Sequence, residues 1–106
     1  MTDSLWPHIQ SLQGRVLHTV AQRKAFTVAK VTDTEAALVV QDGGRTRIIR
    51  RADLEPLWER LVENGELDIA AIKTVYKFNG SLAAALLASA PGVTASVNPI
   101  TLRRRV

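Results

Sequence analysis

The order of apolar and polar residues divides the chain into two parts with different periods. Up to about residue 50, short runs rich in valine and isoleucine alternate between apolar and polar positions, which predicts β-strands. The four runs are RVLHTV at 15–20, AFTVAKV at 25–31, AALVVQ at 36–41 and RTRIIR at 45–50. Between the last two lies Asp42-Gly43, a strong hairpin signal because glycine adopts positive φ easily. We therefore expect an antiparallel β-meander, and whether it closes into a small barrel stays open.

Beyond residue 50 the apolar residues follow a helical period. One stripe has the spacing i, i+3, i+4, i+7, i+8 and consists of Leu54, Leu57, Trp58, Leu61 and Val62. Asp53 is the expected N-cap of this helix, and Gly65 is the expected left-handed residue at its C-terminal end. Pro56 falls in the first turn, where it removes no hydrogen-bond donor that the helix needs. The pattern thus predicts one amphipathic helix between Asp53 and Gly65.

Three further elements are predicted after this helix. A second helix should start at Asp68 and stop near Asn79-Gly80. A third should start with Ser81 as its cap and run through LAAALLASA until Pro91-Gly92. Because the third helix is apolar on almost every side, it should be buried. The runs VTASV and ITLRR on either side of Asn98-Pro99 predict a closing β-hairpin.

These elements together predict an α+β fold, in which an N-terminal antiparallel β-meander packs on three helices and a C-terminal β-hairpin. A length of 106 residues suits one domain, so we expect residues 1–106 to form a single domain. It should be mainly β over 1–50, and helical with the closing hairpin over 51–106.

Composition narrows the class of protein. The chain has no cysteine, which excludes disulfides and thiolate metal sites and is typical of a reducing compartment. Its start does not read as a signal peptide. Its longest apolar run is far shorter than the roughly 20 residues that a membrane helix needs. We expect a soluble, cytoplasmic protein with no membrane partner.

The charges are distributed unevenly along the chain. The net charge is +4, yet six of the ten acidic residues fall in one short block, namely Asp53, Glu55, Glu59, Glu63, Glu66 and Asp68. Cations dominate before and after this block. Such asymmetry is typical of a protein with one side that faces a polyanion or an acidic partner. The alternative is that arginine is simply frequent in this chain.

The stretch RTRIIRR at 45–51 is the densest group of cations. Side chains alternate along a strand, so neither face of this one is purely polar. We expect Ile48 in the core, Arg45 and Arg47 outside, and a twist or bulge near Ile49. Two exposed guanidinium groups two residues apart would lie roughly 6.6 Å apart, which is close to the spacing of successive phosphates on one nucleic-acid strand. The alternative is that the charges only prevent an edge strand from pairing with other chains.

The element order of the second half, three helices followed by a hairpin over residues 51–105, resembles a winged-helix domain. That resemblance implies DNA binding, with the third helix in the major groove and the hairpin wing on the backbone. The candidate recognition helix, SLAAALLASA, offers only Ser81 and Ser89 as polar groups, and so has no side chain suited to reading a base edge. The first half is similar to a small SH3-like barrel, a fold that often serves as a nucleic-acid or peptide adaptor.

No motif in the sequence points to catalysis, a metal or a cofactor. Neither His8 nor His18 has a second ligand at helical spacing. Glu55, Glu59 and Glu63 recur every four residues, which is typical of the solvated face of a helix. The sequence contains neither the GxxxxGK[ST] frame that cradles phosphates nor a GxSxG elbow. We therefore predict a protein that is not an enzyme and holds no metal or cofactor.

These patterns favour a nucleic-acid-associated binding module that contacts phosphate with a basic face and reads little base sequence. DNA is favoured over RNA as its partner. The residues predicted to contact phosphate are Arg45, Arg47, Arg50, Arg51, Lys73, Lys77, Arg103, Arg104 and Arg105. The alternative is a protein-interaction or assembly domain, in which the acidic helix and the basic strand meet in a homo-oligomer or a larger complex.

Overall fold

The fold combines helices with two antiparallel sheets. The structure, a computed structural model, describes residues 5–41, 43–76, 79–97 and 99–104. Within these ranges the order of elements is α1 (Leu5–Ser11), β1 (Val16–His18), β2 (Ala25–Val31), β3 (Glu35–Val40), β4 (Thr46–Arg50), α2 (Arg51–Asn64), β5 (Glu66–Asp68), α3 (Ile69–Val75), α4 (Gly80–Ala88), β6 (Val93–Ser96) and β7 (Thr101–Arg104). The predicted α+β class is confirmed.

The N-terminal strands form the predicted antiparallel meander. They pair in the order β1-β2-β3-β4, so in the described residues β1 and β4 remain the edges of an open sheet and no barrel closes. Gly43 and Gly44 both have positive φ in the turn between β3 and β4. Asp42, the other half of the predicted turn signal, lies outside the described residues.

The inward face of β4 differs from the prediction. Ile49 is 0% exposed and Ile48 is 41% exposed, so the prediction that Ile48 lies in the core is wrong. The register of the strands explains the difference. Ile49 pairs with Ala36, which is buried, while Ile48 pairs with Ala37, which is only partly buried. Arg47 shares the inward face with Ile49 and is only partly exposed, so the prediction that Arg47 lies outside is also wrong.

Helix α2 starts three residues earlier than predicted. Asp53 is therefore not its N-cap; it lies in the first turn, and Arg50 occupies the cap position with extended backbone. The Arg51 amide donates to the Thr34 carbonyl oxygen at 2.8 Å, so the β2–β3 turn provides an acceptor at this helix start. The predicted end is confirmed, because Gly65 has a φ of 73° and its amide donates to the Leu61 carbonyl oxygen at 2.8 Å.

The predicted N-cap is confirmed for α3 and wrong for α4. Asp68 caps α3 as predicted, because its side chain accepts a hydrogen bond from the Ala71 amide at 2.9 Å. The residue at the N-cap of α4 is Asn79, so the prediction of Ser81 as the cap is wrong. The closing hairpin β6–β7 is confirmed, and the short strand β5, which was not predicted, pairs with β7.

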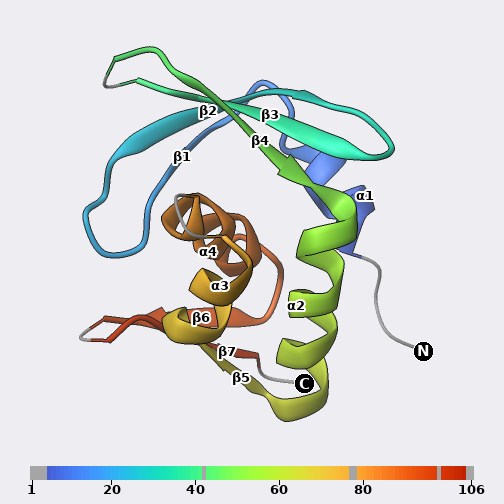
Figure 1. The fold of residues 1–106 in the computed structure, drawn as a ribbon, viewed down its shortest axis with the longest axis vertical. Coiled ribbons are helices and arrows are strands. Elements are labelled where there is room, and N and C mark those ends of the chain that lie inside the picture. The colour runs from blue at the N-terminus through green and yellow to red at the C-terminus, as the bar shows by residue number, and fades with distance from the viewer. Residues whose placement is uncertain (1–4, 42, 77–78, 98, 105–106) are drawn as a thin grey trace.

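Helices α3 and α4 lie between the two sheets, with α2 along one side (Figure 1). Every residue of α4 from Leu82 to Leu87 is buried, which confirms that this helix is covered. The N-terminal helix α1 was not predicted, and its Trp6 Nε1 donates to the Thr32 carbonyl oxygen at 2.7 Å. The buried side chains of both halves form one hydrophobic cluster. No helix in the described ranges combines the length and apolar character that crossing a bilayer requires.

Candidate nucleic-acid interface

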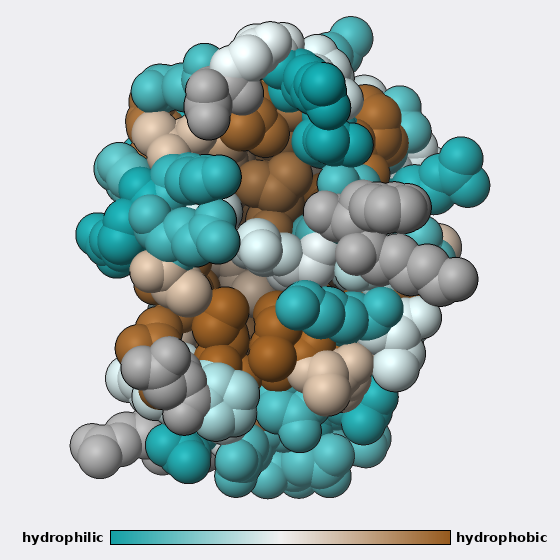
Figure 2. All heavy atoms as spheres, turned by 60° about the vertical axis from the view of Figure 1, so that its left-hand side comes forward, coloured by the Kyte–Doolittle hydropathy of each residue, from teal (hydrophilic) through white to brown (hydrophobic). Residues whose placement is uncertain are grey.

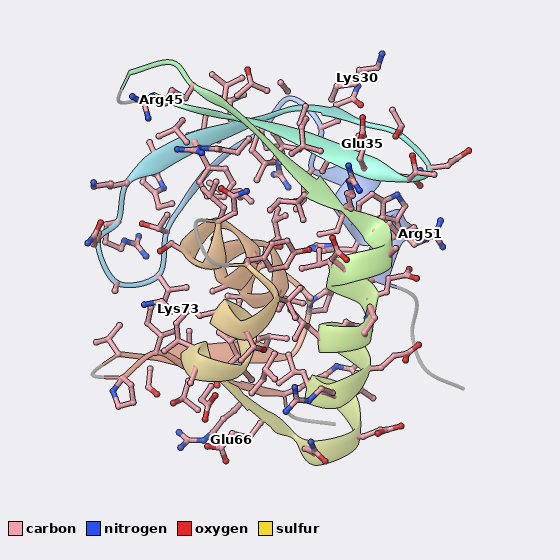
Figure 3. All side chains as sticks on the ribbon, viewed as in Figure 1. Lys30, Glu35, Arg45, Arg51, Glu66 and Lys73 are labelled. Carbon is pink, nitrogen blue, oxygen red and sulfur yellow. The ribbon has the colours of Figure 1, made fainter. Side chains whose placement is uncertain are left out.

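Three of the predicted phosphate-contacting residues lie on one side of the molecule. Arg45 and Lys73 both point away on the side opposite α2 (Figure 3). Arg47, two residues after Arg45, is on the inward face of β4 and lines a cavity beside the start of α4. Lys77 and Arg105 lie outside the described residues.

Arg51 has structural partners within the protein. Its Nε is 3.0 Å from a Glu55 carboxylate oxygen, and its Nη1 donates to the Asp33 carbonyl oxygen at 3.1 Å. Its guanidinium also lies 5.8 Å from the centre of the Trp6 ring. These contacts connect the start of α2 to α1 and to the β2–β3 turn. The structure therefore does not bring Arg51 together with Arg45.

The other predicted arginines are also placed apart from Arg45. Arg50 ends β4 and pairs in register with Glu35. On β7, Arg103 is 3.7 Å from Glu66, with both side chains more than half exposed, so this ion pair contributes little. The Arg104 guanidinium lies 4.9 Å from the centre of the Trp58 ring, a cation–π contact. The predicted basic surface is thus split between several parts of the fold.

Sequence reasoning did not assign two cations of one turn, and the fold brings the second of them, Lys24, to the cavity that Arg47 lines. Arg23 and Lys24 lie in the β1–β2 turn, which is held by hydrogen bonds from the Thr19 amide to the Lys24 carbonyl oxygen at 2.9 Å and from the Lys24 amide to the Thr19 hydroxyl at 3.0 Å. Arg23 has a φ of 56°, rare for a residue with a side chain. The sequence did show two cations in a predicted turn, but only the tertiary fold places that turn against α4.

Two hollows lie on this side. The smaller, about 190 Å³, is lined by Lys24, Arg47, Asn79 and Ser81 among others, and we call it the α4 cavity. The larger is an open groove of about 430 Å³ between the β1–β2 turn, α4 and β6. Its walls are mostly apolar, and His18, Arg23, Ser89 and Ser96 supply its polar groups. Figure 2 shows a band of apolar residues sunk between polar rims on this side.

The positive charges of this side form no ion pair with a carboxylate in the described part of the chain. We call the set Arg23, Lys24, Arg45, Arg47 and Lys73 the cationic face. None of these five cations forms an ion pair with a described carboxylate, and no described carboxylate lines either hollow. Helix α2, with its row of carboxylates, lies on the other side (Figure 1). These five cations are therefore separated in space from the carboxylates of α2.

Tyr76 connects the end of α3 to the end of β4. Burial and the nearby Asp53 carboxylate raise the pKa of Tyr76 above its ordinary value. The Tyr76 hydroxyl donates to the Arg50 carbonyl oxygen at 3.4 Å. This arrangement keeps the phenol protonated as a structural donor. In the described ranges, no three His, Asp or Glu side chains gather as a metal site.

No protein-family model, no curated protein and no solved structure matches this chain.

Proposed function

We propose that this protein binds nucleic acid through the phosphate backbone, using the cationic face as its contact surface. The observation that carries the proposal is that five cations from three distant segments lie on one side without a carboxylate partner. Such a side creates a positive potential that attracts polyanions. Neutralising phosphates with these cations releases condensed counterions, which drives sequence-independent binding.

The second half of the chain supports DNA as the partner. Residues 51–104 run through helices α2, α3 and α4 and then the antiparallel hairpin β6–β7. This order supports the resemblance to a winged-helix domain that the sequence suggested. We keep the family's association with DNA as part of the proposal, because winged-helix domains contact DNA with a helix and a wing.

The position of α4 favours backbone contact over base reading. In the winged-helix family the third helix enters the major groove. Here α4 lies beneath the N-terminal sheet (Figure 1), and its residues 82–87 are buried. Of the two polar residues that could read bases, Ser89 already has hydrogen-bond partners within the protein. Its hydroxyl donates to the Leu86 carbonyl oxygen at 2.6 Å and lies 3.2 Å from His8 Nε2. We therefore propose binding with little sequence preference.

Fluorescence anisotropy tests this proposal. The unmodified protein is titrated at low salt into two labelled DNA duplexes of unrelated sequence, the matching RNA duplex and a single strand. We expect similar affinities for the two DNA duplexes and weaker binding to RNA. Absence of binding to all four probes at low salt would overturn the proposal, and a large preference for one DNA sequence would overturn the backbone mode.

A second candidate function follows from the same separation of charge. The carboxylates of α2 on one side and the cationic face on the other are complementary, so copies of the chain could associate through opposite sides. This assembly function predicts a mass that rises with protein concentration and falls with salt. Light scattering over a range of concentrations measures it. A constant monomeric mass at low salt excludes it and leaves nucleic-acid binding in place.

A further inference from the structure

The α4 cavity has the composition of an anion site. It opens between the end of the N-terminal sheet and the first turn of α4, and its floor includes the apolar side chains Phe26, Val40 and Leu82. At about 190 Å³ it exceeds several times the roughly 30 Å³ that a water molecule occupies in the liquid, which leaves room for a tetrahedral oxyanion.

Two cations from different elements line this cavity. Lys24 comes from the β1–β2 turn and Arg47 from β4, and neither forms an ion pair with a described carboxylate. Two positive charges that line one cavity repel each other, and an anion between them would offset that repulsion. Arg47 also provides a planar fork of donors that suits phosphate oxygens.

The start of α4 lies at the same cavity, which Asn79, Ser81 and Leu82 line. Among the described residues the first intrahelical bond runs from the Ala83 amide to the Asn79 carbonyl oxygen at 2.9 Å. The amides of Gly80, Ser81 and Leu82 precede it, and amides at this position in a helix have no acceptor within the helix. The Asn79 side chain does not cap them. The positive end of the helix dipole adds to the attraction for an anion.

The Oδ1 atom of Asn79 has no hydrogen-bond partner, but it is inaccessible to solvent and so does not face the open space of the cavity. The proposed site therefore does not use the Asn79 side chain.

We infer that the α4 cavity binds a single phosphate group, held by Lys24, Arg47 and the first amides of α4. The inference rests on the proposed function insofar as the phosphate belongs to a nucleic acid, either as an internal phosphodiester or as the monoester at a chain end. In that role the cavity fixes the register of one phosphate, while the rest of the cationic face follows the backbone.

The experiment is a titration of the ¹⁵N-labelled full chain with inorganic phosphate at constant ionic strength, followed by amide chemical shifts. We expect saturable shifts concentrated at the amides of Gly80, Ser81 and Leu82. The variants Lys24→Gln and Arg47→Gln should each weaken phosphate binding about tenfold, the size expected for loss of one charge-assisted contact. Shifts scattered over the surface, or α4 amides that do not respond, would overturn the inference.

Two further variants separate the cavity from general charge and from misfolding. Lys30→Gln removes an exposed cation that belongs neither to the cavity nor to the cationic face, and it should leave phosphate affinity within about twofold. An equal loss in Lys30→Gln and Arg47→Gln would contradict a specific site. Arg47→Lys keeps the charge and should recover part of the affinity. The melting temperature of each variant shows whether its fold is retained.

Oligonucleotides with a 5′-phosphate or a 5′-hydroxyl distinguish the sources of the phosphate. A chain end in the cavity makes the phosphorylated oligonucleotide bind more tightly, and Arg47→Gln removes the difference. An internal phosphodiester makes both bind equally, and Arg47→Gln weakens both. If both oligonucleotides bind but the α4 amides ignore phosphate, the cavity inference fails alone. If neither binds while the amides respond, the proposed function fails and the phosphate site remains.

Discussion

The two adjacent isoleucines of β4 offer a direct test of which face of the strand points inward. Ile49 is 0% exposed and Ile48 is 41% exposed. Ile49→Ala and Ile48→Ala make the same chemical change one residue apart, so each serves as the control for the other. The test matters for function because Arg47 lies on the same face as Ile49, and a shift of one residue in register would turn Arg47 away from the α4 cavity.

The expected losses follow from the two exposures. Isoleucine to alanine removes about three carbons, each worth ~0.8 kcal/mol when buried, so Ile49→Ala loses about 2.4 kcal/mol of transfer free energy. A residual cavity of about 50 Å³ adds about 1.2 kcal/mol, for a total near 3.5 kcal/mol. Ile48 is about six-tenths buried and its loss leaves a surface that water fills, so Ile48→Ala should cost about 1.4 kcal/mol.

Urea titrations followed by circular dichroism measure both free energies of unfolding. The expected difference of about 2 kcal/mol corresponds to about 8 °C in melting temperature for a domain of this size. Equal losses, or a larger loss for Ile48→Ala, would refute the register and with it the inward position of Arg47.

Three further predictions concern local features. Because burial and Asp53 raise the pKa of Tyr76, the unfolded chain ionises at this residue first as the pH rises through its ordinary value near 10. The free energy of unfolding should therefore fall above that pH by up to ~1.4 kcal/mol per pH unit. Tyr76→Phe should remove this part of the fall, as measured by urea titrations at several pH values. An identical pH dependence in both proteins would contradict the raised pKa of Tyr76. Gly65→Ala should cost about 1 kcal/mol from its φ of 73° alone, since nothing lies within 4 Å of an added Cβ, and a raised melting temperature would contradict this. Asp68→Ala should cost about 1 kcal/mol by removing the cap of α3, with Asp68→Asn as a control that keeps the acceptor, and equal melting temperatures of the two variants would exclude that role.

Local sequence signals predicted the elements whose determinants lie within them. The four strands of the meander follow from the alternation of apolar and polar residues, with turn residues between the runs. The end of α2 follows from Gly65, which adopts positive φ. The buried state of α4 follows from its apolar composition alone. Burial on all sides needs no knowledge of which element provides the cover.

Features that depend on contacts between residues far apart in the chain could not be predicted from the sequence. Ile48 and Ile49 are equally apolar, and only pairing with β3 decides which one is buried. The start of α2 depends on the Thr34 carbonyl oxygen across the β2–β3 turn. For the same reason the sequence could not predict that Arg23 and Lys24 lie beside α4, since only tertiary packing brings the β1–β2 turn to this helix.

The salt dependence of DNA affinity tests the central claim most directly. If all five cations of the cationic face contact phosphates, log K should fall with log salt with a slope of about −4.5, from ~0.9 per phosphate. Arg45→Gln/Lys73→Gln should reduce the slope by about 1.8, while Lys30→Gln/Arg60→Gln, the same change in net charge at exposed positions outside the cationic face, should leave it unchanged. Equal reductions in both double variants, or a slope near zero in the unmodified protein, would contradict a phosphate-binding cationic face.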